Sequence, residues 1–480
     1  MKNILTAMIF LLSGVSLHQL IYNLFPFMQK RYSNKLLALI SENDGSIDCE
    51  IKEDFIDYKY IFRGNSFDGA VWKFNNASFD VTDEFLYGSI DKWDYTPRVH
   101  FHHCEWVLSE KDPVSAVLRH IELYQSATFY WHPSPATQRF FVLFYLYLKN
   151  NCPELKVQID LHVEYIVSNI EINLDGNHFL DNLLAITAYA LLTNNGGLLK
   201  KVVEDIDKYF LVEKEYFPEK TPCYCALLYS RLEIILAINN TRKETEDILV
   251  RLKNLLLNNP PVHLNDSYLE LRNWYDVYPK NSRVSADYYL HKVLEGQKKS
   301  ITLIGNGFAK RGYQAHSHDC CAAMFVQCSD GSQLIGGLGT KSYASDHYRN
   351  DIRSRTSYFR PEIISKKIDY KLFMGSFRNF SIDNNKYSLS LNNNIAHMKV
   401  VEGYGVKIID DKIFFENIKS LPIVFYSDYD KSCIKDHLIF SGFSIISVED
   451  SDRWDGICNK VKSHKYTVMA DSDISSIQVL

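Results

Sequence analysis

Two histidines that stand two residues apart could carry chemistry late in the chain. His316 and His318 belong to the run Ala315-His316-Ser317-His318-Asp319-Cys320-Cys321, which leads into a predicted strand. Because alternate residues of a strand face the same side, the two imidazoles are expected to project together. Such a pair suits acid–base work or metal binding, although surface histidine pairs also arise without a function.

Two other polar groups stand where helices are expected to begin. Asn177 and His178 open one apolar-periodic segment, and Tyr224 follows Thr221 and Pro222 at the start of another. Asn and Thr are common caps, Pro suits the first turn, and an aromatic or histidine beside a cap often belongs to the core. Each of these two motifs therefore has a structural explanation beside a functional one.

A local excess of positive charge follows the histidines, although the whole chain has a formal net charge of −5. It begins after Gly339-Thr340-Lys341-Ser342-Tyr343 and consists of Arg349, Arg353, Arg355 and Arg360. Guanidinium groups bind carboxylates and sulfates through paired hydrogen bonds, so Tyr343, Arg349 and Arg353 are candidate contacts for an acidic ligand. The alternative is a solvated face paired with neighbouring aspartates.

Composition excludes several classes of protein. The 480 residues are 46% hydrophobic and 23% charged, as in folded globular domains, which excludes a disordered or fibrous chain. The negative net charge gives no reason to expect a nucleic-acid partner. Ten cysteines without a Cys-x-x-Cys pair are too few for a disulfide scaffold and do not support a zinc ribbon.

The periodicity of apolar residues divides the chain into a helical part and a β part. Helices are expected near residues 113–124, 136–149, 158–172, 178–193, 197–211, 222–239 and 243–258. After about residue 298 the period becomes two, and strands are expected near 300–304, 322–326, 333–335, 387–391, 398–409, 412–416, 421–426 and 437–447. We therefore predict a multidomain α+β protein, with an N-terminal region and leading helix at 1–110, a helical domain at 111–297 and an antiparallel β-sandwich at 298–480.

The N-terminal segment permits two interpretations. Lys2 precedes an apolar run from Ile4 to Leu17 that resembles a signal-peptide core and is too short to span a bilayer comfortably. The same pattern continues through Phe27 to Arg31, which fits one amphipathic helix of the mature protein. We expect no stable transmembrane span and a location in the periplasm or cell envelope, with the cytoplasm as the alternative.

The motifs, taken in order, resemble the heparinase II/III-like family of polysaccharide lyases, in the alginate and heparin lyase superfamily. The resemblance covers most of the chain. The segments that carry it are Arg98-Val99-His100-Phe101-His102-His103-Cys104-Glu105-Trp106, Gly176-Asn177-His178-Phe179-Leu180, Glu219-Lys220-Thr221-Pro222-Cys223-Tyr224 and His316-Ser317-His318.

The resemblance implies an N-terminal incomplete (α/α) toroid followed by the C-terminal antiparallel β-sandwich. It implies β-elimination beside a uronate of an acidic polysaccharide or oligosaccharide, with a link to surface polysaccharide metabolism. Asn177 and His178 match the family position that holds the developing enolate charge. Tyr224 and His316 match the pair that share the base and acid roles.

The sequence departs from the family at its metal site. His318 is the only retained ligand, because Gly337 stands in place of an aspartate and Ser357-Tyr358-Phe359-Arg360 replaces the segment with the other histidine. One imidazole cannot make a structural zinc site, so no metal or other cofactor is expected. The departures also favour an alternative, a catalytically impaired glycan-binding or polysaccharide-assembly protein of the same fold. A hydrolase with paired carboxylates has little support at these motifs.

Overall fold

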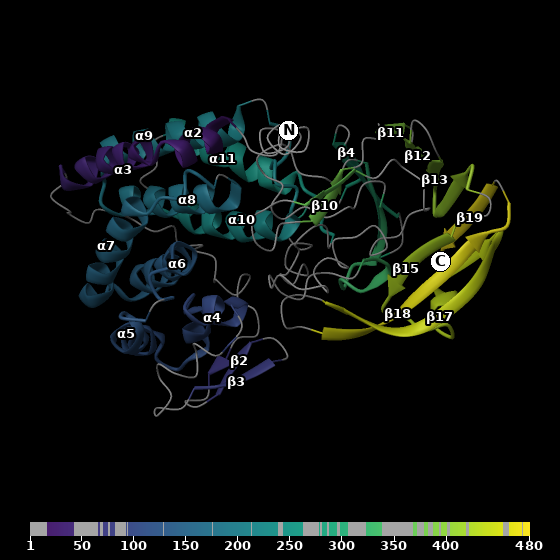
Figure 1. Cartoon of the computed structure of the whole chain (residues 1–480), viewed down its shortest axis with the longest axis horizontal. Coiled ribbons are helices and arrows are strands. Elements are labelled where there is room, and N and C mark those ends of the chain that lie inside the picture. The colour runs from purple at the N-terminus through teal and green to yellow at the C-terminus, as the bar shows by residue number, and fades with distance from the viewer. Residues whose placement is uncertain are drawn as a thin grey trace, which may run out of the picture. The chain divides into compact units, whose positions relative to one another are not determined.

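The protein is a mixed α+β chain that divides into two compact units. The computed structural model (Figure 1) describes residues 17–42, 66–67, 71–74, 77–81, 93, 95–127, 129–174, 176–212, 214–238, 243–262, 278, 281–285, 288–294, 298–305, 323–337, 368–371, 379–382, 387–392, 395–400, 404–418, 422–454, 460–472 and 474–480. The first unit takes its described residues from the chain up to Pro218 and from Tyr224–Leu256. The second takes them from Glu219–Cys223 and from Leu257 onward.

Helices dominate the first unit. They are α2 (Leu17–Leu24), α3 (Pro26–Ser41), α4 (Tyr95–Phe101), η4 (Glu105–Ser109), α5 (Pro113–Tyr124), α6 (Pro133–Asn150), α7 (Pro153–Ser168), α8 (Gly176–Leu192), α9 (Gly196–Ile206), η5 (Asp207–Leu211), α10 (Pro222–Leu236) and α11 (Lys243–Leu257). A small antiparallel sheet accompanies them, formed by β1 (Ser66–Phe67), β2 (Val71–Phe74) and β3 (Ala77–Asp80).

Local chemistry explains where several of these helices begin. Helices α3, α5, α6, α7 and α10 each start at a proline, whose fixed φ and missing N–H suit the first helical position. At α5 the Asp112 side chain also caps the helix by accepting a hydrogen bond from the Ser115 backbone N–H at 3.1 Å. At α8 the first residue, Gly176, has a φ of +61°, which a residue with a Cβ adopts only at a cost.

Antiparallel sheets make up the second unit. One sheet has the order β4 (Arg283–Ser285), β5 (Tyr289–Val293), β6 (Lys299–Ile304), β7 (Met324–Cys328), β8 (Gln333–Ile335). A second has the order β11 (Tyr387–Asn392), β12 (Ile395–Val400), β13 (Gly405–Ile409), β14 (Lys412–Glu416), β19 (Ile474–Val479), β16 (Leu438–Ser441). The others are β15 (Pro422–Ser427), β18 (Lys460–Ala470), β17 (Phe443–Trp454) and the pair β10 (Asn379–Ile382), β9 (Ile368–Lys371); η9 (Ile434–Asp436) precedes β16.

One hydrophobic core joins three of these sheets. It contains side chains from β5–β8, from β12–β14 with β16 and β19, and from β15 and β18. Near its middle the ring of Phe425 stacks on that of Tyr466, with centroids 4.8 Å apart and planes 4° apart. Because both residues are fully buried, this stack contributes dispersion and burial energy without exposing apolar surface.

The structure follows the expected order of helices and then strands but differs in several elements. The small sheet β1–β3 was not expected, and the run expected at 398–409 is two strands, β12 and β13. Strands β4 and β5 come before residue 298, because β5 is buried on both faces and therefore shows no alternation in its sequence. The run expected at 437–447 is two strands, β16 and β17, separated at Gly442, whose φ is +74°. The N-terminal amphipathic segment is not one helix, because Pro26 ends α2 and begins α3.

The aromatic stack leads to a stability prediction. Phe425→Ala should lower the free energy of unfolding by about 3–5 kcal/mol, because it leaves a cavity against Tyr466 in a closed core. The control, Ile446→Thr, alters a side chain that is 57% exposed and should change that energy by less than about 0.5 kcal/mol. Urea unfolding followed by circular dichroism compares the two, and equal effects would contradict this description of the core.

Candidate functional site

Helix α8 carries two of the predicted site residues in its first turn. Every residue of α8 is described, and all but His178 are buried. Asn177 is buried beside it, so the helix presents one half-exposed imidazole next to a buried carboxamide. A helix surrounded by protein on nearly every side places its terminal groups accurately, which suits a site that must orient a ligand.

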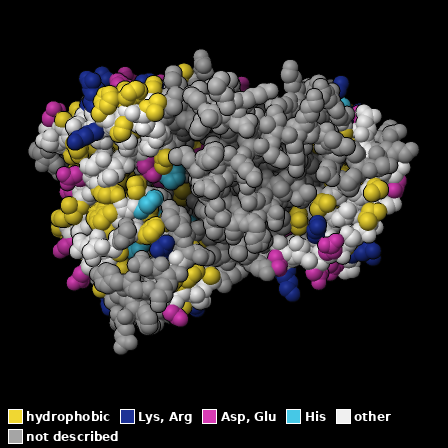
Figure 2. Space-filling model, viewed as in Figure 1, with side chains coloured by type: hydrophobic (Ala, Val, Ile, Leu, Met, Phe, Trp, Pro, Cys, Tyr) yellow, Lys and Arg dark blue, Asp and Glu magenta, His cyan; other side chains and the backbone are white. Residues whose placement is uncertain are grey.

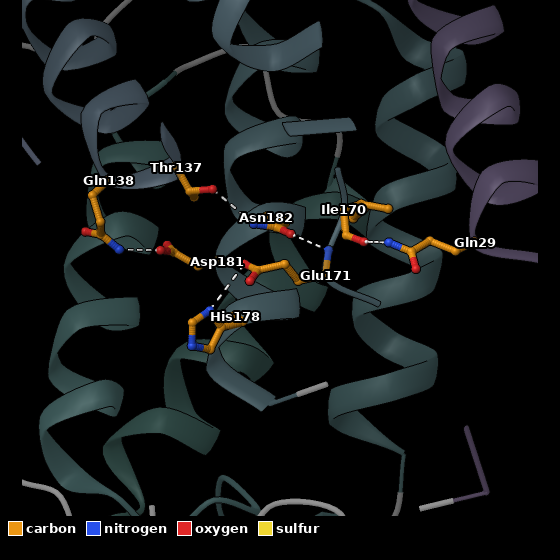
Figure 3. Close-up of polar contacts among 8 residues, drawn as sticks. All are labelled: Gln29, Thr137, Gln138, Ile170, Glu171, His178, Asp181 and Asn182. Carbon is orange, nitrogen blue, oxygen red and sulfur yellow. Dashed lines mark hydrogen bonds and ion pairs between the residues drawn. The ribbon is translucent and has the colours of Figure 1, made fainter. Parts of the chain in front are cut away.

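The His178 ring is oriented by a carboxylate. Its Nδ1 lies 3.2 Å from Oε2 of Glu171, a buried residue just before α8 (Figure 3). Because a carboxylate only accepts hydrogen bonds, Nδ1 is the protonated nitrogen in this contact. In the neutral ring Nε2 is then the nitrogen that can accept a proton, which is the arrangement required of a general base or of an orienting group.

Asn182 fixes the segment that carries Glu171. Its Oδ1 accepts a hydrogen bond from the Glu171 backbone N–H at 2.8 Å, and its Nδ2 donates to Thr137 Oγ1 of α6 at 3.0 Å (Figure 3). On the other side of the segment, Gln29 of α3 donates from Nε2 to the Ile170 carbonyl oxygen at 2.8 Å. Residues of α3, α6 and α8 therefore fix the backbone that carries the Glu171 carboxylate, through neutral hydrogen bonds.

A buried polar network joins α8 to α6 and α10. Gln138 Nε2 donates to Asp181 Oδ2 at 2.5 Å, while Gln138 Oε1 accepts a hydrogen bond from the Arg231 guanidinium. Arg231 Nε lies 3.9 Å from Asp181 Oδ1, and both side chains are almost completely buried. Because Asp181 lies one turn after Asn177, the network fixes the position of the first turn of α8.

Burial and neighbouring charges alter the acidity of this cluster. Burial raises the pKa of Asp181 to about 6; Glu171 contributes to the rise, while Arg231 and His178 oppose it. Burial lowers the pKa of His132, and the nearby Glu171 acts against that change. The cluster thus contains a carboxyl that titrates well above the usual range for aspartate, a common property of functional sites.

Tyr224 lies in the first turn of α10 and is buried. Arg231 follows it by seven residues, two helical turns, and so shares its face of α10. The Arg231–Asp181 ion pair therefore joins the helix of Tyr224 to the helix of Asn177 and His178. The other predicted site residues, His316, His318, Tyr343, Arg349 and Arg353, lie outside the described residues.

Other histidines of the first unit have a structural role. Arg139, fully buried in α6, donates from Nε to His162 Nε2 at 2.8 Å and from NH1 to the His102 carbonyl oxygen at 2.7 Å. Burial, with the Arg139 charge as the next cause, lowers the pKa of His102 to about 3 and that of His162 well below its usual value. These rings stay neutral near pH 7, and the bond from Arg139 to the His102 carbonyl oxygen holds the Arg98–Trp106 segment against α6.

Sequence reasoning did not find four members of the cluster: Glu171, Asp181, Gln138 and Arg231. One signal was available, since Asp181 follows Asn177 by four residues and must share its helix face. Gln138 lies 43 residues before its partner Asp181. Arg231 lies 93 residues after its partner Gln138. No local pattern connects positions that far apart.

Two kinds of feature are absent from the described part of the chain. Among the described residues, no three His, Cys, Asp or Glu side chains are grouped so that they could hold a metal ion. Among the helices that the structure describes, none is both long and apolar enough to cross a bilayer.

Comparison with known proteins reveals a fold match without a sequence match. No protein-family model matches the chain, and no curated protein matches it. The crystal structure of heparinase III is similar over 97% of this chain and 92% of its own, with 11% identity and a TM-score of 0.52. A heparinase III gene product (13% identity, 99% and 93% coverage, TM-score 0.45) and the heparan sulfate lyase HepC from Pedobacter heparinus (12%, 94% and 87%, TM-score 0.40) are also similar.

The chain therefore has a polysaccharide lyase fold in which helices precede antiparallel sheets. The heparinase III structure, with its TM-score of 0.52, carries this conclusion. This likeness confirms, at the level of the fold, the resemblance inferred from the motifs. At 11% identity it extends to the fold alone, and the activity is a separate question.

The raised pKa of Asp181 predicts a pH-dependent stability. The folded state holds this proton more tightly than the unfolded state, so the contribution of Asp181 to stability is greatest below about pH 4 and is lost as the pH rises through about 6. Asp181→Asn imitates the protonated form and removes that dependence. The unfolding free energy of the variant minus that of wild type, measured in urea, should therefore become more positive as the pH rises from about 4 to about 7, whatever the constant cost of losing the charge beside Arg231. A constant difference across this range would refute the assignment.

The missing ligands predict the metal content. Purified protein, dialysed without chelator and analysed by plasma mass spectrometry, should contain far less than one zinc per chain, because His318 retains only one of the family's ligands. A ratio near one zinc per chain that falls in a His318→Ala variant would show that other residues complete the site.

Proposed function

We propose that the protein is a lyase that cleaves an acidic, uronate-containing polysaccharide by β-elimination. The observation that carries the proposal is the joint placement of Asn177 and His178 at the start of α8 and of Tyr224 at the start of α10, in a chain with the heparinase III fold. The Asp181–Arg231 pair supports it by connecting the two helices.

The finer architecture is part of the proposal. We assign the helical unit to the incomplete (α/α) toroid class. The succession of helices of similar length from α5 to α11, joined by short links, supports this assignment. We assign the β unit to the antiparallel sandwich class, which a core shared by three sheets supports.

The chemistry requires a place for negative charge and a route for a proton. A base removes the C5 proton of the uronate, the C4–O4 bond breaks as a C4=C5 double bond forms, and an acid protonates the departing O4. The C5 proton becomes acidic only when the adjacent carboxylate is held by hydrogen-bond donors. The Asn177 carboxamide, with His178 beside it, provides donors of that kind.

Tyr224 and His316 are assigned to the proton transfers. A buried tyrosine hydroxyl can remove or deliver a proton when the substrate is in contact with it, and the partner imidazole completes the exchange. Glu171 accepts a hydrogen bond from His178 Nδ1, so the ring can donate to the sugar carboxylate from Nε2 when it is the imidazolium. Tyr343, Arg349 and Arg353 are proposed as contacts to acidic groups of the sugar chain.

A second candidate is a glycan-binding or polysaccharide-assembly protein of the same fold that lacks turnover. The replacement of the metal-ligand positions by Gly337 and by Ser357-Tyr358-Phe359-Arg360 favours it. The retention of Asn177, Tyr224 and His316 favours the lyase, because binding alone does not require an acid and a base.

The test is incubation with a panel of uronate polysaccharides while far-ultraviolet absorbance reports the unsaturated product. Tyr224→Phe should lower kcat by about 100-fold or more, because it removes a proton-transfer group while keeping the ring. Tyr229→Phe is the matched control: it removes a hydroxyl from the same helix, beside Lys253 and Glu233, and should keep wild-type kcat.

Two outcomes would overturn the lyase assignment. The first is binding of a uronate polymer, measured by calorimetry, without any unsaturated product from wild type. The second is equal activity of Tyr224→Phe and Tyr229→Phe on a substrate that wild type cleaves.

A further inference from the structure

The junction of α2 and α3 exposes large apolar side chains. Leu24 is 62% exposed and Phe27 is 66% exposed, and the neighbouring Phe25 and Met28 are also exposed. The rings of Phe25 and Phe27 contact each other edge to face, with centroids 5.9 Å apart. We call these four residues the α2–α3 corner. Exposed apolar patches of this kind mark interaction sites more often than isolated exposed residues do.

Contacts on the opposite side of α3 determine which way the corner faces. Gln29 donates to the Ile170 carbonyl oxygen, and the Tyr32 hydroxyl donates to Asp205 Oδ2 at 2.5 Å. Leu36 is fully buried on the same side. Because these contacts hold one face of α3 against the unit, Phe27 is kept on the outer face and cannot turn inward without breaking them.

Positive charge flanks the corner. Lys30, Arg31 and Lys35 are exposed on the outer part of α3, within three turns of Phe27. Residues 17–41 contain no Asp or Glu, so nothing within α2 and α3 offsets these charges. Figure 2 shows yellow hydrophobic side chains beside dark blue Lys and Arg side chains on the end of the helical unit that contains α2 and α3.

One further exposed apolar residue lies near the corner, and the sequence before α2 is also apolar. Asn23 Nδ2 donates to the Asn173 carbonyl oxygen at 3.3 Å, which brings the next residue, Leu174, close to the corner; Leu174 is 48% exposed. In the sequence, residues 1–16 directly precede α2, are rich in Ile, Leu, Met and Phe, and have Lys2 as their only charged residue.

We propose that the α2–α3 corner docks onto the surface of an anionic lipid bilayer. Leu24, Phe25 and Phe27 enter the boundary between headgroups and acyl chains, while Lys30 and Arg31 contact anionic headgroups. The helices lie on the membrane and do not cross it, because α2 and α3 contain 8 and 16 residues and are separated at Pro26.

The combination of groups favours a lipid surface over a protein partner. A protein interface of ordinary size places its basic residues opposite acidic ones and surrounds an apolar centre with a polar rim on every side. Here the apolar residues continue into an apolar N-terminal sequence on one side, and the basic residues follow on the other. This order, apolar anchor and then Lys and Arg, is typical of interfacial helices.

The experiment is sedimentation of the full chain with vesicles. One set of vesicles is pure phosphatidylcholine, and the other is an equimolar mixture of phosphatidylcholine and phosphatidylglycerol. Wild type should pellet with the mixed vesicles. Phe25→Ser/Phe27→Ser should lower the partition coefficient roughly tenfold or more, because two apolar anchors are lost.

Two further variants distinguish the contribution of the apolar corner from that of the basic residues and from non-specific hydrophobic adsorption. Lys30→Gln/Arg31→Gln should reduce the preference for anionic vesicles and make binding less sensitive to salt. Val250→Thr/Ile446→Thr, which alters exposed apolar side chains elsewhere, should bind as wild type does. Circular dichroism of each variant checks that it is folded.

The proposal is overturned if folded wild type stays in the supernatant with both kinds of vesicle, or if Phe25→Ser/Phe27→Ser pellets as wild type does. It is also overturned if wild type is a dimer by light scattering that this double variant converts to monomer without vesicle binding, since a second copy would then cover the corner.

Discussion

Helix α8 is buried along almost its whole length, and this constraint determines how the helical unit is built. A helix in that position cannot leave Asp181 or Asn182 solvated, so both must find partners inside the protein. Gln138 donates a hydrogen bond to Asp181 and Arg231 forms an ion pair with it, while Thr137 and the Glu171 backbone satisfy Asn182. Removing one member of a buried charged pair typically costs about 3–5 kcal/mol, which makes the arrangement of α6, α8 and α10 specific.

The same constraint separates histidines by environment. His102 and His162 surround the fully buried Arg139 and remain neutral, so they pack the core and accept hydrogen bonds. His178 stands at the half-exposed end of the buried helix beside Glu171, where a charged or a neutral ring can both be accommodated. The difference lies in burial and in the sign of the neighbouring charge; residue type alone does not reveal it.

Much of the architecture could be predicted from the sequence, because helix starts have local causes. Prolines and caps mark the beginnings of α5 and α10, and their apolar periodicity indicates the buried face; the start of α7 at Pro153 was missed, because the periodicity placed that helix at 158–172. Strand β5 was missed because burial on both faces removes the alternation that identifies a strand. The Gln138–Asp181–Arg231 network was missed for a different reason: its members come from three helices far apart in sequence, and only the fold brings them together. His316 and the Arg349–Arg353 region stay predictions, since they lie outside the described residues.

The central claim is that Asn177, His178 and Tyr224 serve an elimination reaction. The most direct test is mass spectrometry of the products formed from a defined uronate oligosaccharide. In elimination the masses of the two products add up to that of the substrate, and the product from the reducing side of the broken bond carries the C4=C5 double bond at its new non-reducing end. Product masses that add up to the substrate plus one water would show hydrolysis instead and would contradict the account.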